Sequence, residues 1–267
     1  MDKMQKDIND ALETTRKWNP LLMIFAMPLY LFLIIWASYF PMGVLRLASE
    51  DGHELVTQLT SIENSLFPPA SFFGFLFLFS WLCFISFYII SKRNRIKAYL
   101  LTQILQLILF VIFYYSWFIA NLYFIPLVAI RIVYWIGFVL SLIYFIYIFV
   151  TKQRARKDFF ASLNIKKFLN VILFLWLLMS GINLFTHGLN HFLAHLLLAL
   201  LPISPILFGL FMVSFLKSYL VTLENLNAVN KNQEKYREEY DYTIEEWYGK
   251  KSKMYKEQVK KQRGISK

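Results

Sequence analysis

Acidic side chains are missing from every long apolar run of this chain. The 17 Asp and Glu residues fall in residues 2–13, in residues 50–63, at Asp158 and in residues 224–257. Proton-coupled carriers commonly place carboxylates at mid-membrane depth, where a charge is costly and is kept for function. The distribution therefore argues against a proton-driven carrier and an intramembrane aspartyl protease. It also argues against a lipid phosphotransferase that holds metal on intramembrane aspartates.

Cysteine is nearly absent. The single cysteine, Cys83, lies within the apolar run 71–90, so an intrachain disulfide and a thiolate metal site are both excluded. The chain also has no Walker sequence, G-x-S-x-G, G-x-G-x-x-G or C-x-x-C pair. We therefore expect a protein that is not an enzyme, uses no cofactor and has no ATPase activity of its own.

Apolar residues dominate what is present. They make up 58% of the chain, charged residues only 17%, and the mean hydropathy is +0.48. Soluble domains are roughly half apolar and a quarter charged. The composition predicts an all-α, polytopic integral membrane protein of the cell membrane, with the lipid bilayer as its main surroundings.

Positive charge is concentrated between the apolar runs. All but Arg46 and Arg131 of the 28 Lys and Arg residues lie in four segments. Basic loops are retained in the cytoplasm, so these segments predict that both termini and two loops share the cytoplasmic side, with six crossings between them. The net charge of +11 follows from this bias and makes nucleic acid an unlikely partner. The four segments are residues 1–18, 91–97, 151–167 and 217–267.

Six helical regions are predicted from the apolar runs. Each of the first five has about the length needed to cross a bilayer, and the first lacks a cleavage site and is expected to remain as an anchor. We expect an external loop at 41–69, containing a short helix at 53–62. The last region is expected to break at Pro202–Pro205 into a re-entrant piece and a half-length span, or to form one bent span. The six regions are 21–40, 70–90, 98–120, 125–150, 168–186 and 188–216.

Two polar segments flank this membrane domain, which we place at residues 20–217. Residues 1–19 predict an amphipathic helix at the membrane interface with Trp18 at headgroup depth, or else a solvated tail. Residues 218–267 predict a cytoplasmic tail with an aromatic stripe on one helix, which would dock on the membrane, on the protein or on a partner. The stripe consists of Tyr236, Tyr240, Ile244, Trp247, Tyr255 and Val259.

One polar cluster near the ends of the last two regions is the main candidate site. Its three histidines are spaced at i, i+4 and i+8, which on one continuous helix would align three imidazoles. Three histidines can hold zinc, but Gly188 predicts a helix end, no acid is expected nearby, and the spacing matches no hydrolase signature. The cluster is thus expected to be a hydrated interface without metal, with a polar transport path and a metal or haem site as the alternatives. Its members are Asn183, His187, Asn190, His191 and His195.

Arg131 is the one strongly charged side chain predicted within a span. It follows the short turn before the fourth region by about two helical turns. A charge near a helix end can extend to the interface, and this is our expectation for Arg131. The alternative is an anion-recognition point on a translocation path.

The basic segments predict contacts with partners. Lys92, Arg93, Arg95, Arg154 and Arg156 are expected to dock a cytosolic partner. The basic end of the tail is expected to bind anionic lipid, because juxtamembrane Lys and Arg are attracted to anionic leaflets. Its candidate lipid-binding residues are Lys250, Lys251, Lys253, Lys260 and Lys261.

The predicted architecture of Met1 to Leu220 resembles that of ABC-2-type exporter permeases. The resemblance lies in six spans with both termini inside, an interfacial helix before the first span and a proline-broken region before the last. It implies a permease-like subunit of a transport or export system, energised by a separate ATPase. The alternative is a membrane scaffold or pore subunit of a secretion, conjugation or defence assembly that acts through its tail, with other membrane subunits or a second copy as partners.

Overall fold

The computed structural model describes residues 9–10, 12–15, 17–151, 165–250, 252–262 and 264. These residues form helices and connecting segments, with no strand among them. The chain divides into two compact units, described separately below. The tail unit comprises Met1–Ile34, Gly74–Phe110 and Val221–Lys267, and the pocket unit comprises Ile35–Phe73 and Val111–Leu220.

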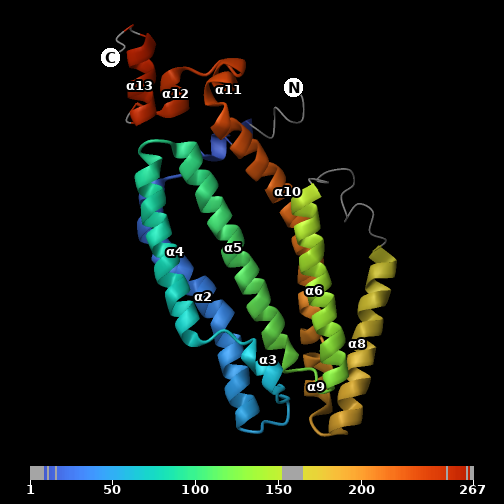
Figure 1. The fold of residues 1–267 in the computed structure, drawn as a ribbon. Helices are drawn as coiled ribbons and strands as arrows, with labels where there is room; N and C mark the ends of the chain where they lie inside the picture. Colours follow the sequence, from blue (N-terminus) through green and yellow to red (C-terminus); the bar gives the residue numbers. More distant parts are fainter. Residues whose placement is uncertain are drawn as a thin grey trace. The chain divides into compact units, whose positions relative to one another are not determined.

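In the part of the chain that the structure describes, six long helices and six short ones follow one another (Figure 1). The long helices are α2 (Pro20–Glu50), α4 (Ala70–Ser91), α5 (Arg95–Leu122), α6 (Val128–Thr151), α8 (Ile165–His187) and α10 (Ser204–Lys231). The short ones are α3 (Ser61–Ser65), α9 (Phe192–Leu198), the 3-10 turn η1 (Leu201–Ile203), α11 (Gln233–Glu239), α12 (Ile244–Tyr248) and α13 (Lys253–Gln262).

Four stretches in the described part of the chain contain helices long and apolar enough to cross a membrane. Large apolar side chains on them face outward, with Phe25 76%, Phe75 65% and Phe174 64% exposed. Such exposure would be costly in water and is expected against lipid. This is consistent with a membrane location. The four stretches are Ile24–Glu50, Ser61–Ser91, Arg95–Leu122 and Leu169–His187.

Helix α2 continues past the end predicted for it. The sequence analysis places a loop from Pro41 onward, but the helix runs to Glu50. Proline removes one backbone donor without ending a helix whose next turns are otherwise stabilised. Here Met42 is fully buried, and Arg46 pairs with Glu50 one turn later at 2.9 Å. The loop therefore begins about ten residues later in the chain than predicted.

The short helix expected at 53–62 is also displaced. Residues 53–60 are not helical, and α3 begins at Ser61. The side chain of Thr60 accepts from the backbone N–H of Glu63, whose carboxylate in turn accepts from the backbone N–H of Thr60. This reciprocal capping box fixes the start of the helix.

The predicted break at Pro202–Pro205 is confirmed. Residues Leu201–Ile203 form the 3-10 turn η1, and α10 begins directly after it. Side chains of α5 hold the break in place: Tyr114 Oη donates to the Pro205 carbonyl at 3.2 Å, and Trp117 Nε1 donates to Ser204 Oγ at 3.0 Å. Helix α10 has 28 residues and passes residue 217, the end of the predicted membrane domain, without interruption.

The core of the pocket unit is aromatic. Phe118 of α5 lies at its centre and stacks on two rings of α6, with centroid distances of 4.5 Å to Tyr134 and 4.1 Å to Phe138. Trp135 meets Phe118 edge-on at 4.8 Å. Paired rings of this kind stabilise a helix contact beyond their buried area.

In the described residues of the C-terminal tail, the end of α10 is followed by three short helices instead of the single helix predicted. Asp241 has a φ of 53° and Gly249 a φ of 75°, and a right-handed helix cannot pass through either residue. The first turn is held by Arg237, which pairs with Glu234 at 2.8 Å and donates to the Tyr242 carbonyl at 3.1 Å.

The aromatic stripe packs on the protein itself, one of the three possibilities predicted. In the tail unit, Trp247 and Tyr248 share a hydrophobic cluster with Ile96 and Leu100 of α5. Seven further hydrophobic side chains of the tail pack against this cluster. They are Leu223, Tyr236, Tyr240, Tyr242, Ile244, Met254 and Tyr255.

The N-terminal segment uses its apolar face in the same way. Residues 12–15 are helical, and Leu12, Thr15 and Trp18 are all buried. Trp18 contacts the ring of Tyr99 edge-on at 5.5 Å, so this face packs on the protein. The other two positions of the predicted face, Met4 and Ile8, lie outside the described residues.

Candidate functional site: a histidine-lined pocket

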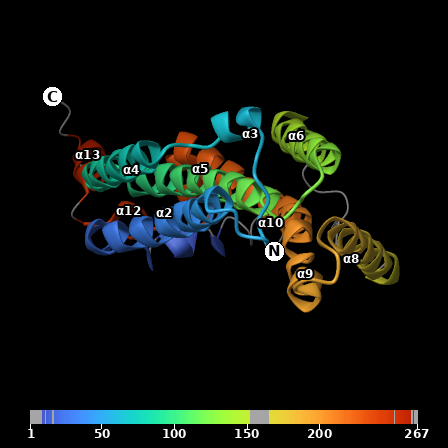
Figure 2. The ribbon, with the colours of Figure 1, turned by 90° about the horizontal axis from the view of Figure 1, so that it is seen from below.

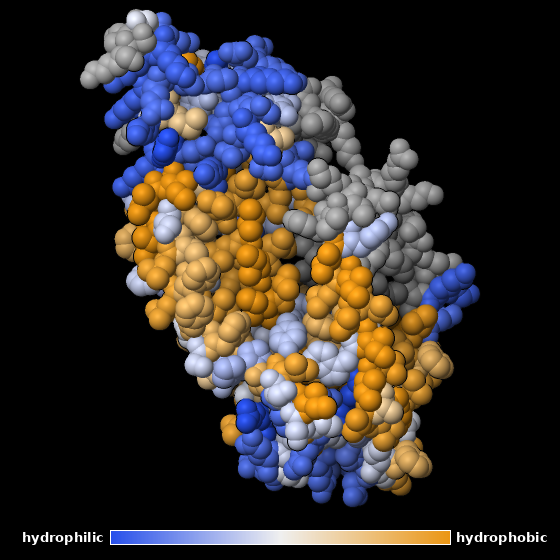
Figure 3. All heavy atoms as spheres, viewed as in Figure 1, coloured by the Kyte–Doolittle hydropathy of each residue, from blue (hydrophilic) through white to orange (hydrophobic). Residues whose placement is uncertain are grey.

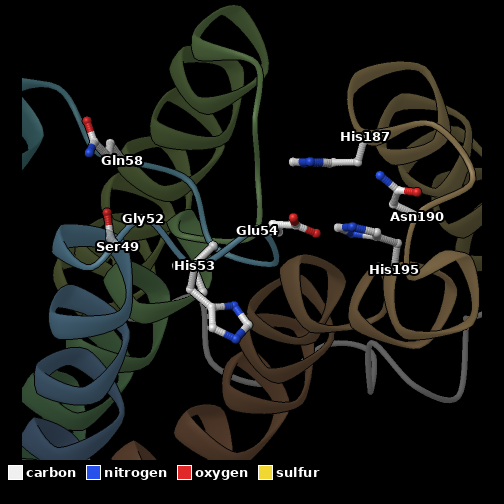
Figure 4. A pocket seen from close by; sticks show the side chains of 9 residues that line it. Ser49, Gly52, His53, Glu54, Gln58, His187, Asn190 and His195 are labelled. Carbon is white, nitrogen blue, oxygen red and sulfur yellow. The ribbon is translucent and has the colours of Figure 1, made fainter.

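An open pocket with a volume of about 300 Å³ lies in the pocket unit (Figure 4). Three of the four histidines in the chain line it, and the fourth, His191, pairs with Glu54 of its wall. The lining comes from the end of α2, the segment after it, the end of α8 and helix α9. The residues are Ser49, Gly52, His53, Glu54, Val56, Gln58, His187, Asn190 and His195.

The three neighbouring histidines do not share one helix. Helix α8 ends at His187, where Gly188 has a φ of 65°, and His191 has a φ of 50° before α9 begins. The i, i+4, i+8 stripe is therefore interrupted, and the helix end predicted at Gly188 is confirmed. Helix α9 folds back beside the C-terminal end of α8 (Figures 1 and 2).

This reversal brings His187 and His195 face to face. Their ring centroids are 4.5 Å apart and the planes differ by 12°. His195 is 5% exposed, and burial is the main cause that lowers its pKa, followed by the neighbouring His187 and His191. Glu54 acts in the opposite direction. His195 is therefore held mainly as the neutral imidazole at neutral pH.

An acid lies close to these histidines, contrary to the sequence analysis. The carboxylate of Glu54 is 3.2 Å from Nε2 of His191, and it points toward the His187 and His195 rings (Figure 4). Glu54 lies in the segment after α2, far from the histidines in sequence, so only the fold shows the proximity. Both partners of the pair are more than half exposed.

Asn183 does not reach the pocket. It is buried in α8, and its Nδ2 donates to the His195 carbonyl at 3.4 Å. Trp176 Nε1 donates to the Leu196 carbonyl at 3.0 Å. The two bonds tie α9 to α8, so Asn183 positions the pocket, while exposed Asn190 lines it.

Arg131 is also absent from the pocket, and its guanidinium is buried inside the protein. Its side chain is 3% exposed and forms an ion pair with Glu63, with Nε 3.1 Å from Oε1. The Nη1 group donates to the carbonyls of Gln58 and Ile125 at 3.1 and 3.2 Å. The guanidinium is held by a carboxylate and two carbonyls, which offsets part of the cost of burying it.

This buried pair supports one wall of the pocket. Thr57 donates its backbone N–H to the Tyr123 carbonyl at 2.9 Å, and Arg131 holds the next carbonyl, that of Gln58. The Gln58 side chain faces the pocket from this segment. We name Arg131, Glu63 and Thr57 the loop clamp.

Several residues of this arrangement were not predicted from the sequence, among them His53, Glu54, Thr57, Gln58 and Glu63. The spacing of Thr60 and Glu63 is that of a capping box, and it could have located α3. Nothing in the sequence indicates that Glu63 pairs with Arg131 or that Glu54 pairs with His191. Those contacts depend on which helix ends come together.

The pocket offers hydrogen-bonding groups of both kinds. Imidazole, carboxamide, hydroxyl and carboxylate groups converge on it, and this set suits a polar solute. Among the described residues, no group of three His, Cys, Asp or Glu side chains has an arrangement that could hold a metal ion.

The predicted docking and lipid-binding residues are found partly together. Lys92, Arg93 and Arg95 lie at the α4–α5 turn, and the backbone N–H of Lys253 donates to the Lys92 carbonyl at 3.2 Å. Lys250 also lines a pocket beside this turn, while Lys260 and Lys261 are exposed near the end of α13. Three predicted residues, Arg154, Arg156 and Lys251, lie outside the described part of the chain.

Comparisons with known proteins do not place this chain in a family. No family model, no curated protein and no solved structure matches it.

Proposed function

We propose that this chain is the membrane-embedded, permease-like subunit of a transport or export system energised by a separate ATPase. In this proposal it crosses the cell membrane six times with both termini in the cytoplasm. The four apolar stretches, α6 and α10 supply the crossings. The distribution of Lys and Arg supports the orientation.

The interrupted entry to the last long helix is the observation that carries the proposal. Helix α9 has seven residues, too few to cross a membrane, and left-handed and 3-10 turns flank it. Irregular backbone close to a bilayer is tolerated where it lines a polar cavity, and transporters commonly bind solutes at such interruptions. Here the interruption adjoins the histidine-lined pocket.

The topology can be tested with the one native cysteine removed. In a Cys83→Ser background, single cysteines at exposed Asp51, Leu189, Arg93 and Lys260 would be treated with a membrane-impermeant maleimide. We expect Asp51→Cys and Leu189→Cys to react in intact cells. Arg93→Cys and Lys260→Cys should react only after permeabilisation. Labelling of all four in intact cells would contradict the orientation.

Partner identity tests the transport role. The full-length protein would be purified in mild detergent and its stoichiometric partners identified by mass spectrometry. We expect a cytosolic P-loop ATPase, lost with Arg93→Glu and retained with Lys260→Glu. Recovery of other envelope proteins alone would refute the permease proposal.

A scaffold acting through its tail is the second candidate. The packing of Trp247 and Tyr248 on Ile96 and Leu100 favours it, because the tail forms an ordered surface with the α4–α5 turn. Loss of partners with Lys260→Glu but not with Arg93→Glu would support this alternative.

A further inference from the structure

A second pocket, with a volume of about 530 Å³, lies within the tail unit. The described residues that line it include three cations, Lys92, Arg95 and Lys250, and no carboxylate. Lys92 and Arg95 are predicted to dock a partner, and Lys250 is predicted to bind lipid. Residues from both predictions therefore line the same cavity. The lining is completed by Asn19, Ser91, Tyr248, Gly249 and Ser252.

Backbone contacts join the three chain segments that form this basic pocket. The backbone N–H of Lys253 donates to the Lys92 carbonyl, and the guanidinium of Arg95 donates to the carbonyl of Trp18. Gly249, with its φ of 75°, turns the chain between α12 and α13 at the pocket wall. The segment before α2, the α4–α5 turn and the tail are thus held around one cavity.

The cations are arranged to accept an anion. Lys92 Nζ lies 4.7 Å from the Tyr88 ring centroid and forms no ion pair with a carboxylate in the described part of the chain. Lys250 pairs with Glu245 at 2.8 Å, but these side chains are 70% and 49% exposed. An exposed pair of this kind contributes little and exchanges readily.

Asn19 adds a neutral donor. Its side-chain oxygen accepts from the backbone N–H groups of Leu21 and Leu22 at the start of α2, at 3.1 and 3.3 Å. With its oxygen used in this way, the carboxamide NH₂ is the group that can donate to a ligand.

The basic pocket lies where two apolar stretches end. Ser91 is the last residue of Ser61–Ser91, and Arg95 is the first of Arg95–Leu122. Figure 3 shows the hydrophobic surface of α4 meeting the hydrophilic surface of the tail helices at this level. Phospholipid headgroups occupy the corresponding level of a bilayer.

We infer that the basic pocket binds the phosphate group of an anionic phospholipid. Arg and Lys bind phosphate oxygens through charge-assisted hydrogen bonds, and three such side chains exceed the charge of one phosphodiester. Free phosphate shares this chemistry. The position at the ends of apolar helices favours the lipid.

Native mass spectrometry of the full-length protein in mild detergent tests the inference. Phosphatidylglycerol, phosphatidylcholine and inorganic phosphate would be titrated separately. We expect wild type to retain one phosphatidylglycerol in preference to phosphatidylcholine. Lys92→Gln with Lys250→Gln should weaken retention about tenfold or more. Lys260→Gln with Lys261→Gln removes the same amount of charge outside the pocket and should leave the retention of phosphatidylglycerol unchanged.

The remaining outcomes are also decisive. An equal loss of bound phosphatidylglycerol in both double variants would overturn the inference, and so would equal retention of phosphatidylglycerol and phosphatidylcholine. Either result would indicate that anionic lipid is attracted by the overall positive charge and not by the pocket. Tight binding of inorganic phosphate that is lost only in the pocket variant would support the phosphate site but assign it a soluble ligand. Lys92→Arg with Lys250→Arg should retain the lipid, and melting of each variant without lipid controls for misfolding.

Discussion

Two ion pairs formed by the segment after α2 differ sharply in their surroundings. Arg131 and Glu63 are 3% and 8% exposed, whereas His191 and Glu54 are 61% and 66% exposed. The distances are similar, 3.1 and 3.2 Å. Burial, not distance, therefore separates a pair that fixes the chain path from one that can open, close and exchange with a solute.

Removing one partner of the buried pair should have the largest effect. Arg131→Met leaves Glu63 as an uncompensated buried charge, and we expect a loss of about 3–5 kcal/mol in the free energy of unfolding. Denaturant titration in detergent measures it. Arg46→Met, at the exposed pair with Glu50, is the matched control and should cost about 0.5 kcal/mol or less. Similar losses in both would remove the distinction by burial.

Replacing both buried partners should restore part of that loss. We expect Arg131→Met with Glu63→Leu to be about 1–3 kcal/mol more stable than Arg131→Met alone, because no charge remains buried without a partner. Recovery should be incomplete, since Glu63 also caps α3. A double-mutant cycle gives the coupling, and simple additivity of the two single changes would contradict the pairing.

Acidification should weaken the pocket through His195. Its pKa is lowered in the folded protein, chiefly by burial, so the folded state binds the proton less tightly than the unfolded state. The stability contributed by neutral His195 is fully present above the ordinary histidine pKa of about 6.5. It falls as the pH drops from there toward the lower pKa that His195 has in the folded protein.

Melting temperatures at about pH 7.5 and about pH 5.5 measure this effect. His195→Gln should flatten the pH dependence, whereas His53→Gln, at an exposed position in the same pocket, should retain it. A steep dependence that survives in His195→Gln would exclude His195 as its source.

The exposed pair should have the smallest effect. Glu54→Gln removes the partner of His191, yet both side chains are largely solvated, so we expect a change of about 1 kcal/mol or less in unfolding free energy. Added salt should reduce the difference further. A loss as large as that of Arg131→Met would show that this pair, too, is structural.

The helices were largely predictable and the pairings were not. Apolar runs located α4, α5, α6 and α8 to within a few residues, because such runs determine helix length directly. The predicted span 21–40 is shorter than α2, which continues through Pro41 and the buried Met42 to Glu50.

The candidate site was predictable only in composition. The histidines and Asn190 were identified from their spacing, but Glu54 and the loop clamp depend on contacts between distant segments. Arg131 and Glu63 illustrate the difficulty: they lie far apart in the sequence, and only the meeting of the α5–α6 turn with the segment before α3 brings them together.

The cluster beneath the tail also dictates an order of assembly. It joins Leu12, Ile96 and Trp247, which lie near the start, in the middle and near the end of the sequence. At roughly 5–20 residues per second, the ribosome adds Trp247 on the order of 10 s or more after Leu12. Until then Ile96 and Leu100 are not covered by Trp247 and Tyr248. The α4–α5 turn of a nascent chain therefore exposes an apolar surface that is accessible to chaperones and is buried in the complete protein.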